Sequence, residues 1–434
     1  MDLQAEAVDV LARLIRFDTV NPPGNERACQ EWLKGYLEDA GLECELLHDG
    51  DAERPNLVAR LTGEAEGPVL GYLSHVDTVL ADASDWRHGP WSGEVHDGAI
   101  WGRGAVDMKS QTAAEAVAVA HLARSGWRPP RGEVKLIAVV DEETGGEHGA
   151  RWLTEQRPDV ARVDWLVNEG GGAVMPYGDR RLYGVCCAEK GTFRFTVRVR
   201  GRAGHASVPA LADNALLKLL PALERLGAGH AAYDVVDEPR ALLAALGEDP
   251  QDPERAITNV RSTDPMLAAL VEPTLGTTFA PTIISAGTKI NVIPGRAEFA
   301  VDCRLPPGLG DDVAIARATE LLGDAAAGLE LDWDEAIVGN RSPLASPLMD
   351  AIGDWIARAD PGAEAVPMTM PGFTDSYWFR VAFPDCVAYG FFPQRHQTLY
   401  ESWPLMHSAD ERLDVRDLGF ATECFADLPR RLLT

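Results

Sequence analysis

The 434-residue chain is predicted to form an α/β domain that is interrupted by a smaller, inserted α+β unit. Three observations predict this fold class. In the first part, short apolar runs of strand length alternate with helical segments, and several runs end in acidic residues. Near residues 189–191 the pattern changes to apolar–basic alternation with a period of two, which is typical of half-exposed antiparallel strands. From about residue 336 the α/β pattern returns and continues to residue 434.

Helices and buried strands follow one another in the first part. A helix is expected from about Asn25 to Ala40, where Leu33 and Leu37 lie on one apolar stripe and Gly41 can end the helix. The other elements expected here are strands over Asn56–Leu61, Val69–Ser74, Val134–Val140 and Asp164–Asn168, and an alanine-rich helix from Asp107 to about Arg124. Acidic residues at the carboxyl ends of successive buried strands are typical of the active sites of open α/β sheets.

The inserted unit is expected to contain antiparallel strands and helices. The strands are predicted over Thr192–Arg200, Ala297–Arg304 and Leu329–Trp333, and the helices over Ala212–Leu226 and Asp311–Leu322. Residues 230–274 are rich in Pro, Asp and Glu, and we interpret them as a decoration of this unit.

Net charge, cysteine content and the length of apolar runs limit which partners and which location we expect for the protein. The net charge of −27 repels phosphate backbones and anionic lipids, so we expect neither nucleic acid nor a membrane surface as a partner. It also means that an anionic substrate needs a local positive charge in its site. Seven scattered cysteines without a C-x-x-C motif favour reduced thiols and a cytoplasmic location. No apolar run approaches the roughly 20 residues of a membrane span.

Two polar residues follow the predicted strand Val69–Ser74. His75 and Asp77 are two positions apart, and residues with that spacing on an extended segment point to the same side. A histidine that binds a metal usually donates its other ring N–H to a carboxylate, which Asp77 can supply. A polar pair that only satisfies the end of a strand is the alternative at this point.

Carboxylates follow other buried runs. Glu142 and Glu143 come directly after Asp141, at the end of a very apolar strand, and adjacent carboxylates repel each other unless cations or a shared proton offset their charges. A solvated acidic loop is the alternative. Asp107 opens a helix after a glycine-bearing loop, where, taken alone, it is better explained as an N-cap. Glu169 precedes three glycines and is a weak signal by itself.

The combination is more informative than its members. It comprises two histidines and three carboxylates, with a further carboxylate in reserve: His75, His407, Asp107, Glu143 and Glu169, and then Glu142. This set suits two divalent ions that share one carboxylate. Zinc accepts both kinds of ligand and keeps an open position in catalytic sites. Two ions roughly 3.5–4 Å apart can activate water and polarise a carbonyl group, so the set favours a hydrolase.

Eight segments resemble, in order and spacing, the di-zinc metallopeptidase family of carboxypeptidase G, aminoacylase, acetylornithine deacetylase and succinyl-diaminopimelate desuccinylase. They are SHVDTV (74–79), GRGAVDMK (102–109), DEETGG (141–146), NEGGG (168–172), GRAGHAS (201–207), GTKINVIPG (287–295), DCRLPPG (302–308) and MHSADE (406–411). The resemblance implies a zinc-peptidase-like catalytic domain with a mostly parallel central sheet, over 1–188 and 338–434. It also implies a ferredoxin-like lid (dimerisation) domain inserted over 189–337.

The resemblance implies a ligand to each of two zinc ions, which cobalt is expected to be able to replace. His75 and Glu169 would bind one ion, Glu143 and His407 the other, and Asp107 would bridge them. His396 lies in the same C-terminal stretch as His407. Glu411 follows His407 by four positions, whereas no acidic residue stands four positions after His396. His407 is therefore the preferred ligand.

Further roles also come from the resemblance. Glu142 would be the general base, Asp77 would hold His75, and His205 from the lid would help to stabilise the oxyanion. Arg304 and Asn291 would contact the carboxylate of the substrate. Gly372 and Thr374, in the segment GFTDS (372–376), would line the same pocket.

Two details of the helix start at Asp107 follow from the comparison with the family pattern. The peptide bond Asp107–Met108 is expected to be cis. Gln111 is a departure, because a small residue is expected there, and it casts doubt only on local packing.

The implied activity is hydrolysis of an amide or peptide bond in a small N-acyl amino acid or dipeptide with a free carboxylate. A homodimer that forms through the lid is the expected assembly. Two alternatives remain: a catalytically inactive binding protein on the same scaffold, and a di-metal hydrolase of another bond type, such as a phosphatase. An activity assay with a chelator control distinguishes an inactive binding protein from a metal-dependent enzyme. A substrate screen distinguishes an amide hydrolase from a hydrolase of another bond type.

Overall fold

A computed structural model describes residues 2–434 and divides them into two compact units. The first unit comprises the chain up to Cys187, Ser342–Met368 and Thr374–Thr434. The second unit comprises Ala188–Arg341 and Thr369–Phe373.

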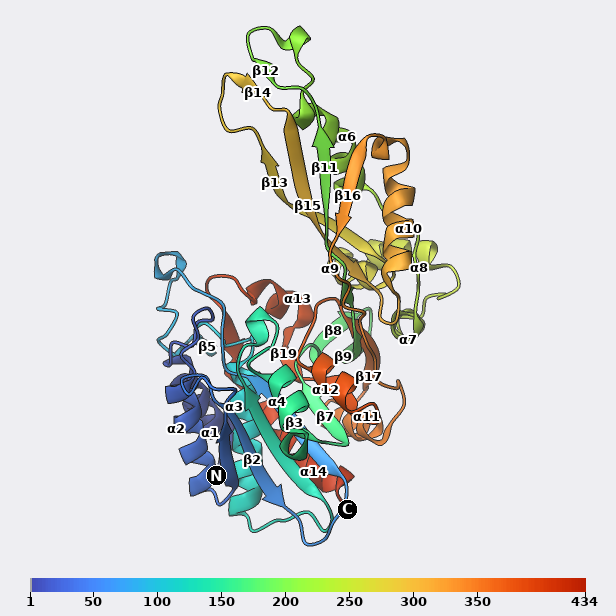
Figure 1. Cartoon of the computed structure of the whole chain (residues 1–434). Coiled ribbons are helices and arrows are strands. Elements are labelled where there is room, and N and C mark those ends of the chain that lie inside the picture. The colour runs from blue at the N-terminus through green and yellow to red at the C-terminus, as the bar shows by residue number, and fades with distance from the viewer. Residues whose placement is uncertain (1) are drawn as a thin grey trace. The chain divides into compact units, whose positions relative to one another are not determined.

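A mixed sheet forms the centre of the first unit (Figure 1). Its strands lie in the order β1-β2-β6-β3-β7-β18-β9-β8-β19, with β17 paired to β9. The four central strands β6, β3, β7 and β18 are parallel, whereas β1 and β2 are antiparallel to their neighbours. The bounds are β1 Glu43–Leu47, β2 Asn56–Thr62, β3 Val69–His75, β6 Glu133–Val139, β7 Trp165–Asn168, β8 Ala173–Tyr177, β9 Arg180–Glu189, β17 Ala363–Met370, β18 Val387–Gly390 and β19 Gln394–Thr398. The predicted α/β class with a parallel sheet centre is confirmed.

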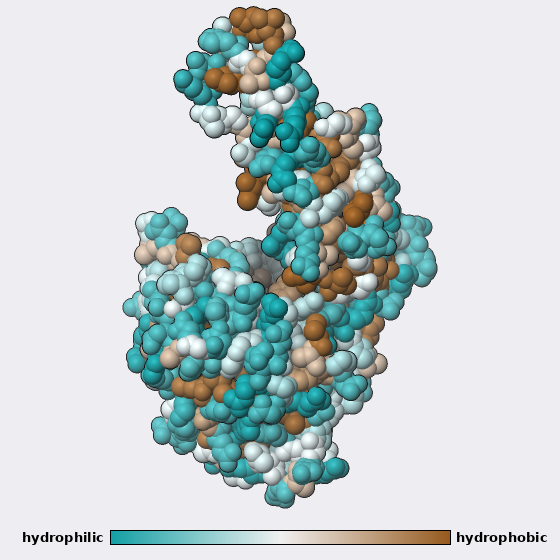
Figure 2. All heavy atoms as spheres, viewed as in Figure 1, coloured by the Kyte–Doolittle hydropathy of each residue, from teal (hydrophilic) through white to brown (hydrophobic). Residues whose placement is uncertain are grey.

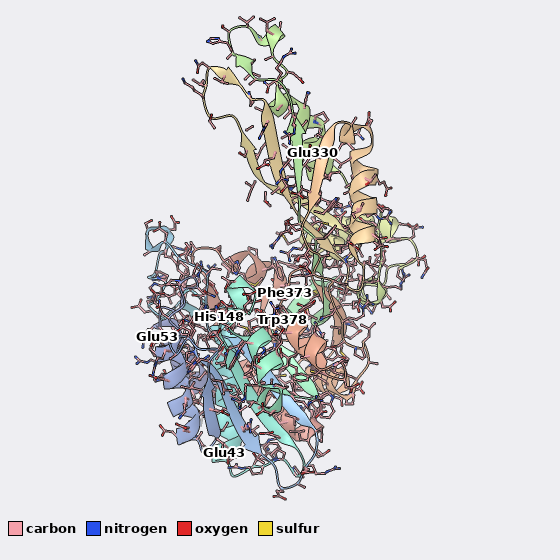
Figure 3. All side chains as sticks on the ribbon, viewed as in Figure 1. Glu43, Glu53, His148, Glu330, Phe373 and Trp378 are labelled. Carbon is pink, nitrogen blue, oxygen red and sulfur yellow. The ribbon has the colours of Figure 1, made fainter. Side chains whose placement is uncertain are left out.

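Helices cover both faces of this sheet because its central strands are apolar on both sides. In β6, Leu136 and Ala138 pack into one core, and Ile137 and Val139 pack into the other. The first core is covered mainly by α1 Leu3–Ile15, α2 Arg27–Asp39, α3 Lys109–Arg124, α11 Pro347–Ala359 and α14 Val415–Leu432. The second is covered by α4 Ala150–Gln156, α5 Pro158–Ala161 and α12 Ser376–Ala382. Figure 3 labels Trp378 of α12 and His148, which precedes α4, in this second layer.

A small antiparallel sheet with the order β20-β5-β4 lies beside these layers in the first unit. Its strands are β4 Glu94–His96, β5 Ala99–Trp101 and β20 Arg412–Asp414. The short helix α13 Leu399–Ser402 precedes β20 in the chain. This sheet pairs a hairpin before α3 with the segment that follows His407.

The second unit is an antiparallel sheet covered by two helices. The strand order β16-β11-β15-β13, with α6 after β11 and α10 after β15, is that of the ferredoxin-like βαββαβ motif. The bounds are β10 Gly191–Thr192, β11 Phe195–Arg200, α6 Ala215–Ala228, β13 Thr278–Ala286, β15 Arg296–Leu305, α10 Asp311–Leu322 and β16 Leu329–Trp333. The predicted alternation is confirmed in β15, where every second side chain from Ala297 to Leu305 is buried.

Two parts of the second unit differ from the sequence interpretation. Residues 230–274, interpreted only as a decoration, form the helices α7 Asp237–Ala245, α8 Pro253–Thr263 and α9 Pro265–Val271. Leu242, Ile257 and Leu267 are buried, so the acidic composition of this segment hid a periodic apolar face. The predicted strand over 192–200 is divided into β10 and β11, which pair with β15 in one continuous register.

Within the described residues, no helix combines the length and the apolar composition that crossing a bilayer requires.

Candidate metal centre

Parallel strands bring the predicted ligands of the first unit to one edge of the sheet. His75 is the last residue of β3 and lies opposite Val139, the last residue of β6. The chain after β6 turns through Asp141, which has a left-handed φ of 73°, into the turn that carries Glu142 and Glu143. Glu169 directly follows β7. Because β3, β6 and β7 are parallel, their carboxyl ends meet at this edge.

The Asp107 carboxylate lies between two histidines. Its Oδ1 is 3.2 Å from His75 Nε2, and its Oδ2 is 3.1 Å from His407 Nε2. Glu143 Oε2 is 3.2 Å from His407 Nε2, and Glu169 Oε1 is 3.9 Å from His75 Nε2. Both histidines therefore share the carboxylate of Asp107. His407 also faces Glu143, and His75 faces Glu169 and, at the same 3.9 Å, Glu142.

The pKa shifts of this cluster reflect several buried carboxylates close together. Burial and the neighbouring charge of Glu169 raise the pKa of Glu142 well above its usual range. Burial and Asp107 do the same for the pKa of Glu169. Hydrogen bonds to Asp107 and Glu143 raise the pKa of His407 to about 10. The carboxylates therefore need positive charge beside them, which bound cations or protons on the imidazoles can supply.

The donor set fits divalent metal ions. Glu143 Oε1 is buried and has no hydrogen-bond partner among residues 2–434, so this oxygen is available as a ligand. Two groups in the cluster have ligand atoms within 4.8 Å of one another: His75 with Glu142 and Glu169, and His75 with Asp107 and Glu143. Imidazole and carboxylate are the ligands that zinc accepts in catalytic sites.

Asp77 contacts both sides of this cluster. His75 Nδ1 lies 3.0 Å from the backbone oxygen of Asp77 and 3.5 Å from its carboxylate. The carboxylate also accepts hydrogen bonds from the backbone N–H groups of Glu142 and Glu143, at 3.3 Å each. Asp77 therefore orients the acidic turn as well as the imidazole, a role that the sequence did not indicate.

Glu411 holds the loop that carries Asp107. Its buried carboxylate accepts hydrogen bonds from the backbone N–H groups of Gly104, Val106 and Asp107, at 3.1, 2.7 and 2.9 Å. Arg103 completes the arrangement with an ion pair of 2.6 Å. Glu411, four positions after His407, thus links the segment of His407 to the loop of Asp107.

A buried polar network behind the acidic turn was not predicted. Asp141 accepts hydrogen bonds from Arg54 and Asn21, at 3.1 Å each, and Arg54 also pairs with Glu26 at 2.8 Å. Asn21 donates in addition to Asp77, at 2.9 Å. The charged residues of this network stand far apart in the sequence, so no local pattern links them. The only local hint that the chain is fixed near Asn21 is the pair of prolines that follows it.

The structure around the start of α3 bears on two expectations, the cis peptide bond after Asp107 and the unexpectedly large residue Gln111. The peptide bond Asp107–Met108 is cis, as predicted. Gln111 is buried in α3 and donates a hydrogen bond of 2.8 Å to Glu115, one turn further along. A larger polar residue fits here because a buried carboxyl group accepts its amide.

His205, Asn291 and Arg304 belong to the second unit. His205 and Asn291 lie together, since β12 Gly204–His205 pairs with β14 Val292–Ile293. Arg304 lies near the opposite end of β15 and binds Asp302 through Nε at 2.7 Å.

The residues of the segment GFTDS fall on both sides of the division. Gly372 is grouped with the second unit, whereas Thr374 belongs to the first. Thr374 Oγ1 lies 3.4 Å from Asn168 Nδ2, and Asn168 is the last residue of β7, directly before Glu169. Thr374 is therefore buried beside the edge of the sheet that carries the candidate metal centre.

Curated proteins resemble the chain over all or about half of its length. A succinyl-diaminopimelate desuccinylase from Alkalilimnicola ehrlichii is 27% identical over 441 residues, which cover 99% of this chain and 100% of the relative. Succinyl-diaminopimelate desuccinylase 2 from Ruegeria sp. is 31% identical over 232 residues, which cover 53% of this chain and 55% of the relative.

Solved structures share the fold. An M20 family metallo-carboxypeptidase, Sso-CP2 from Sulfolobus solfataricus, superposes with a TM-score of 0.75 at 17% identity, with 99% of both chains covered. Human carnosine dipeptidase 1 superposes with a TM-score of 0.73 at 16% identity, covering 99% of this chain and 96% of that chain.

Residues 71–431 match the family described as Peptidase family M20/M25/M40, and this match contains all five residues of the candidate metal centre. The chain belongs to Peptidase family M20/M25/M40 and is a metal-dependent hydrolase.

Proposed function

We propose that the protein hydrolyses the amide bond of a small N-acyl amino acid or dipeptide that has a free carboxylate. The observation that carries the proposal is the Asp107 carboxylate, which lies 3.2 Å from His75 and 3.1 Å from His407. A shared carboxylate between two imidazoles suits two metal ions. The names of the desuccinylase relatives support N-succinyl amino acids as the first substrates to test.

We assign the ligands as the resemblance implies, because Glu142 and Glu169 both lie 3.9 Å from His75 Nε2. His75 and Glu169 would hold one zinc ion, His407 and Glu143 the other, and Asp107 would bind both; cobalt is expected to be able to replace zinc. When bound, such ions polarise a carbonyl group and make water more acidic.

Glu142 is the proposed general base. Its backbone N–H is bound by Asp77, which directs the side chain to the same edge as His75, at 3.9 Å from Nε2. The Glu142 carboxylate takes a proton from the attacking water while the water oxygen bonds to the amide carbon. It then gives this proton to the amide nitrogen as the C–N bond breaks, so the products are a carboxylate and a free amine.

Arg304 is the proposed partner of the carboxylate of the substrate. Its guanidinium donates to both carboxylate oxygens of Asp302, and Arg194 binds the same Asp302 at 3.1 Å. Arg194 can therefore keep Asp302 paired when Arg304 binds a substrate. Gly372 and Thr374 are proposed to line this pocket.

His205 and Asn291 are proposed to act on the reacting end of a substrate bound in another subunit. Arg296 and Arg304 are eight residues apart on one continuous strand, a separation of about 26 Å at 3.3 Å per residue. The β12–β14 pair lies beyond the Arg296 end, so His205 and Arg304 of one chain are too far apart to bind one small substrate.

A homodimer through the second unit would supply both groups to one site. In the described chain β13 pairs only with β15, so its other edge is open. Ile283 and Ile284 on this strand are 68% and 53% exposed, and Leu217 of the adjoining α6 is 59% exposed. Figure 2 shows further hydrophobic side chains at the end of this unit. An open strand edge beside exposed apolar residues is a surface that self-pairing can cover.

A cytoplasmic location is also proposed. Its support is that none of the seven cysteines, all within residues 2–434, forms a disulfide, not even the neighbours Cys186 and Cys187, which are both buried.

The test is a panel of N-succinyl and N-acetyl amino acids and dipeptides, assayed with zinc and with cobalt. Activity should disappear after chelation and return with added metal. Amidation of the carboxylate of the substrate should impair hydrolysis by the wild type and affect the Arg304→Lys variant little, because an ammonium cannot reproduce the two-bond fork. Hydrolysis of phosphate esters alone would refute the proposal.

A further inference from the structure

A second cluster of side chains that could hold a metal ion lies outside the candidate metal centre, on β4 and the segment that precedes it. It consists of His88, Glu94 and His96, and one ligand atom from each lies within 4.8 Å of the others. The rings of His88 and His96 are stacked, with centroids 3.7 Å apart and planes 10° from parallel. His96 Nε2 is 2.9 Å from Glu94 Oε2.

We propose that His88, Glu94 and His96 form a peripheral site for a divalent first-row metal ion. Two imidazoles and one carboxylate are a donor set that zinc accepts with a further position open. Two atoms bound to one zinc ion lie at most about 4.2 Å apart. Small rotations of these partly exposed side chains are therefore enough to bring all three ligands to one ion.

Three arginines lie near the cluster, namely Arg16, whose charge acts on Glu94, and Arg87 and Arg412. Arg87 stacks on Trp101, with its guanidinium carbon 5.0 Å from the ring centroid, but its charge is paired with Asp410 at 2.6 Å. Arg412 stacks on the same ring at 4.7 Å. The carboxylate of Glu94 is available to bind an ion, because its ion-pair contact is with His96, which belongs to the same proposed site.

The site adjoins the loop that carries His407. β5 pairs with β20, which begins five residues after His407. Arg87, next to His88, donates to Asp410 from both its backbone N–H and its Nε, at 2.8 and 2.6 Å. Asp410 and His407 both have left-handed backbone conformations, with φ of 61° and 59°. An ion that fixes His88 therefore restrains this loop from outside the candidate metal centre.

The test counts bound metal. The chain is stripped with a chelator, dialysed against increasing zinc and analysed for zinc per chain. The wild type should bind one ion more than the variant His88→Gln/His96→Gln. The control His48→Gln/His230→Gln, which removes two exposed histidines elsewhere, should match the wild type. This difference of one ion does not depend on how many ions the candidate metal centre holds.

Two further measurements complete the test. Excess zinc should raise the Tm of the wild type above that of the double variant, because a ligand that binds only the folded chain stabilises it. Glu94→Gln should weaken zinc binding at the additional site without changing the fold. Basal activity at low zinc should be retained in this variant and in the double histidine variant, which shows that both fold. Equal zinc counts in the wild type and the double variant would overturn the proposal.

Discussion

At the scale of single residues, the proposed function depends on two adjacent glutamates having different tasks. Glu143 lies 3.2 Å from His407, whereas the closest imidazole to Glu142 is His75 at 3.9 Å. Asp77 binds the backbone N–H of both. The turn thus presents the Glu143 carboxylate closely to a histidine, whereas the Glu142 carboxylate lies further from any imidazole, although the two residues are neighbours in the chain.

The first prediction separates these tasks. Glu142→Gln should lower kcat by about 10²- to 10⁴-fold, because it removes a proton acceptor. The number of bound metal ions, measured by elemental analysis, should stay the same. Glu143→Gln is the matched variant and should lose metal. If Glu142→Gln loses an ion instead, the two roles are reversed.

The second prediction concerns Glu115, whose buried carboxyl group accepts a hydrogen bond from Gln111. Burial raises its pKa well above the ordinary value. The folded chain therefore keeps a proton that the unfolded chain releases, so this group lowers stability as the pH rises above about 4.3.

Glu115→Gln should remove this pH dependence and raise the free energy of unfolding between pH 6 and pH 8. Urea unfolding at several pH values measures the effect. The exposed Glu423→Gln on α14 is the control and should behave as the wild type does. A steeper fall in stability with pH in the Glu115 variant would contradict the assignment.

At the scale of elements, the candidate metal centre is held by contacts between loops that are distant in the sequence. Glu411 binds the loop before α3 through three backbone N–H groups, and Asp141 receives hydrogen bonds from Arg54 and Asn21. These contacts fix two loops relative to the sheet edge, and the ligands on the loops are fixed with them.

The third prediction tests the role of Glu411. Glu411→Gln removes the charge that pairs with Arg103 and weakens the hold on the loop of Asp107. Loss of a partner of this kind typically reduces metal affinity about 10- to 100-fold. The zinc dissociation constant is the measurement. Glu401→Gln, an exposed capping residue of α13, is the control. Unchanged affinity would show that the loop keeps its conformation without this charge.

At the scale of the whole molecule, activity should require two chains, and this is the fourth prediction. Glu142→Gln and His205→Ala chains carrying different tags are co-expressed, and the mixed dimer is purified. If His205 acts on the neighbouring subunit, one site of the mixed dimer has both groups, and about half of the wild-type activity per dimer should return. No recovery would assign His205 to its own chain, and a monomer in light scattering would refute the dimer.

Much of this protein was predictable from the sequence because it depends on local periodicity and on fixed spacing. The apolar runs that became β2, β3, β6 and β7, and the alternation in β15, follow from which side chains must be buried. Acidic residues directly after β6 and β7 predicted a reactive sheet edge, since parallel strands must end together.

Only the tertiary structure decided which oxygen meets which imidazole. The two contacts of Asp107 with His75 and His407, the bonds of Glu411 to the Asp107 loop, and the pairing of Arg54 with Asp141 join residues that are 32 to 307 positions apart. The separation of His205 from Arg304 likewise follows from the length of β15. Periodicity reports which side chains are buried, whereas contacts between distant segments are set by strand order and loop closure, and no local pattern encodes those.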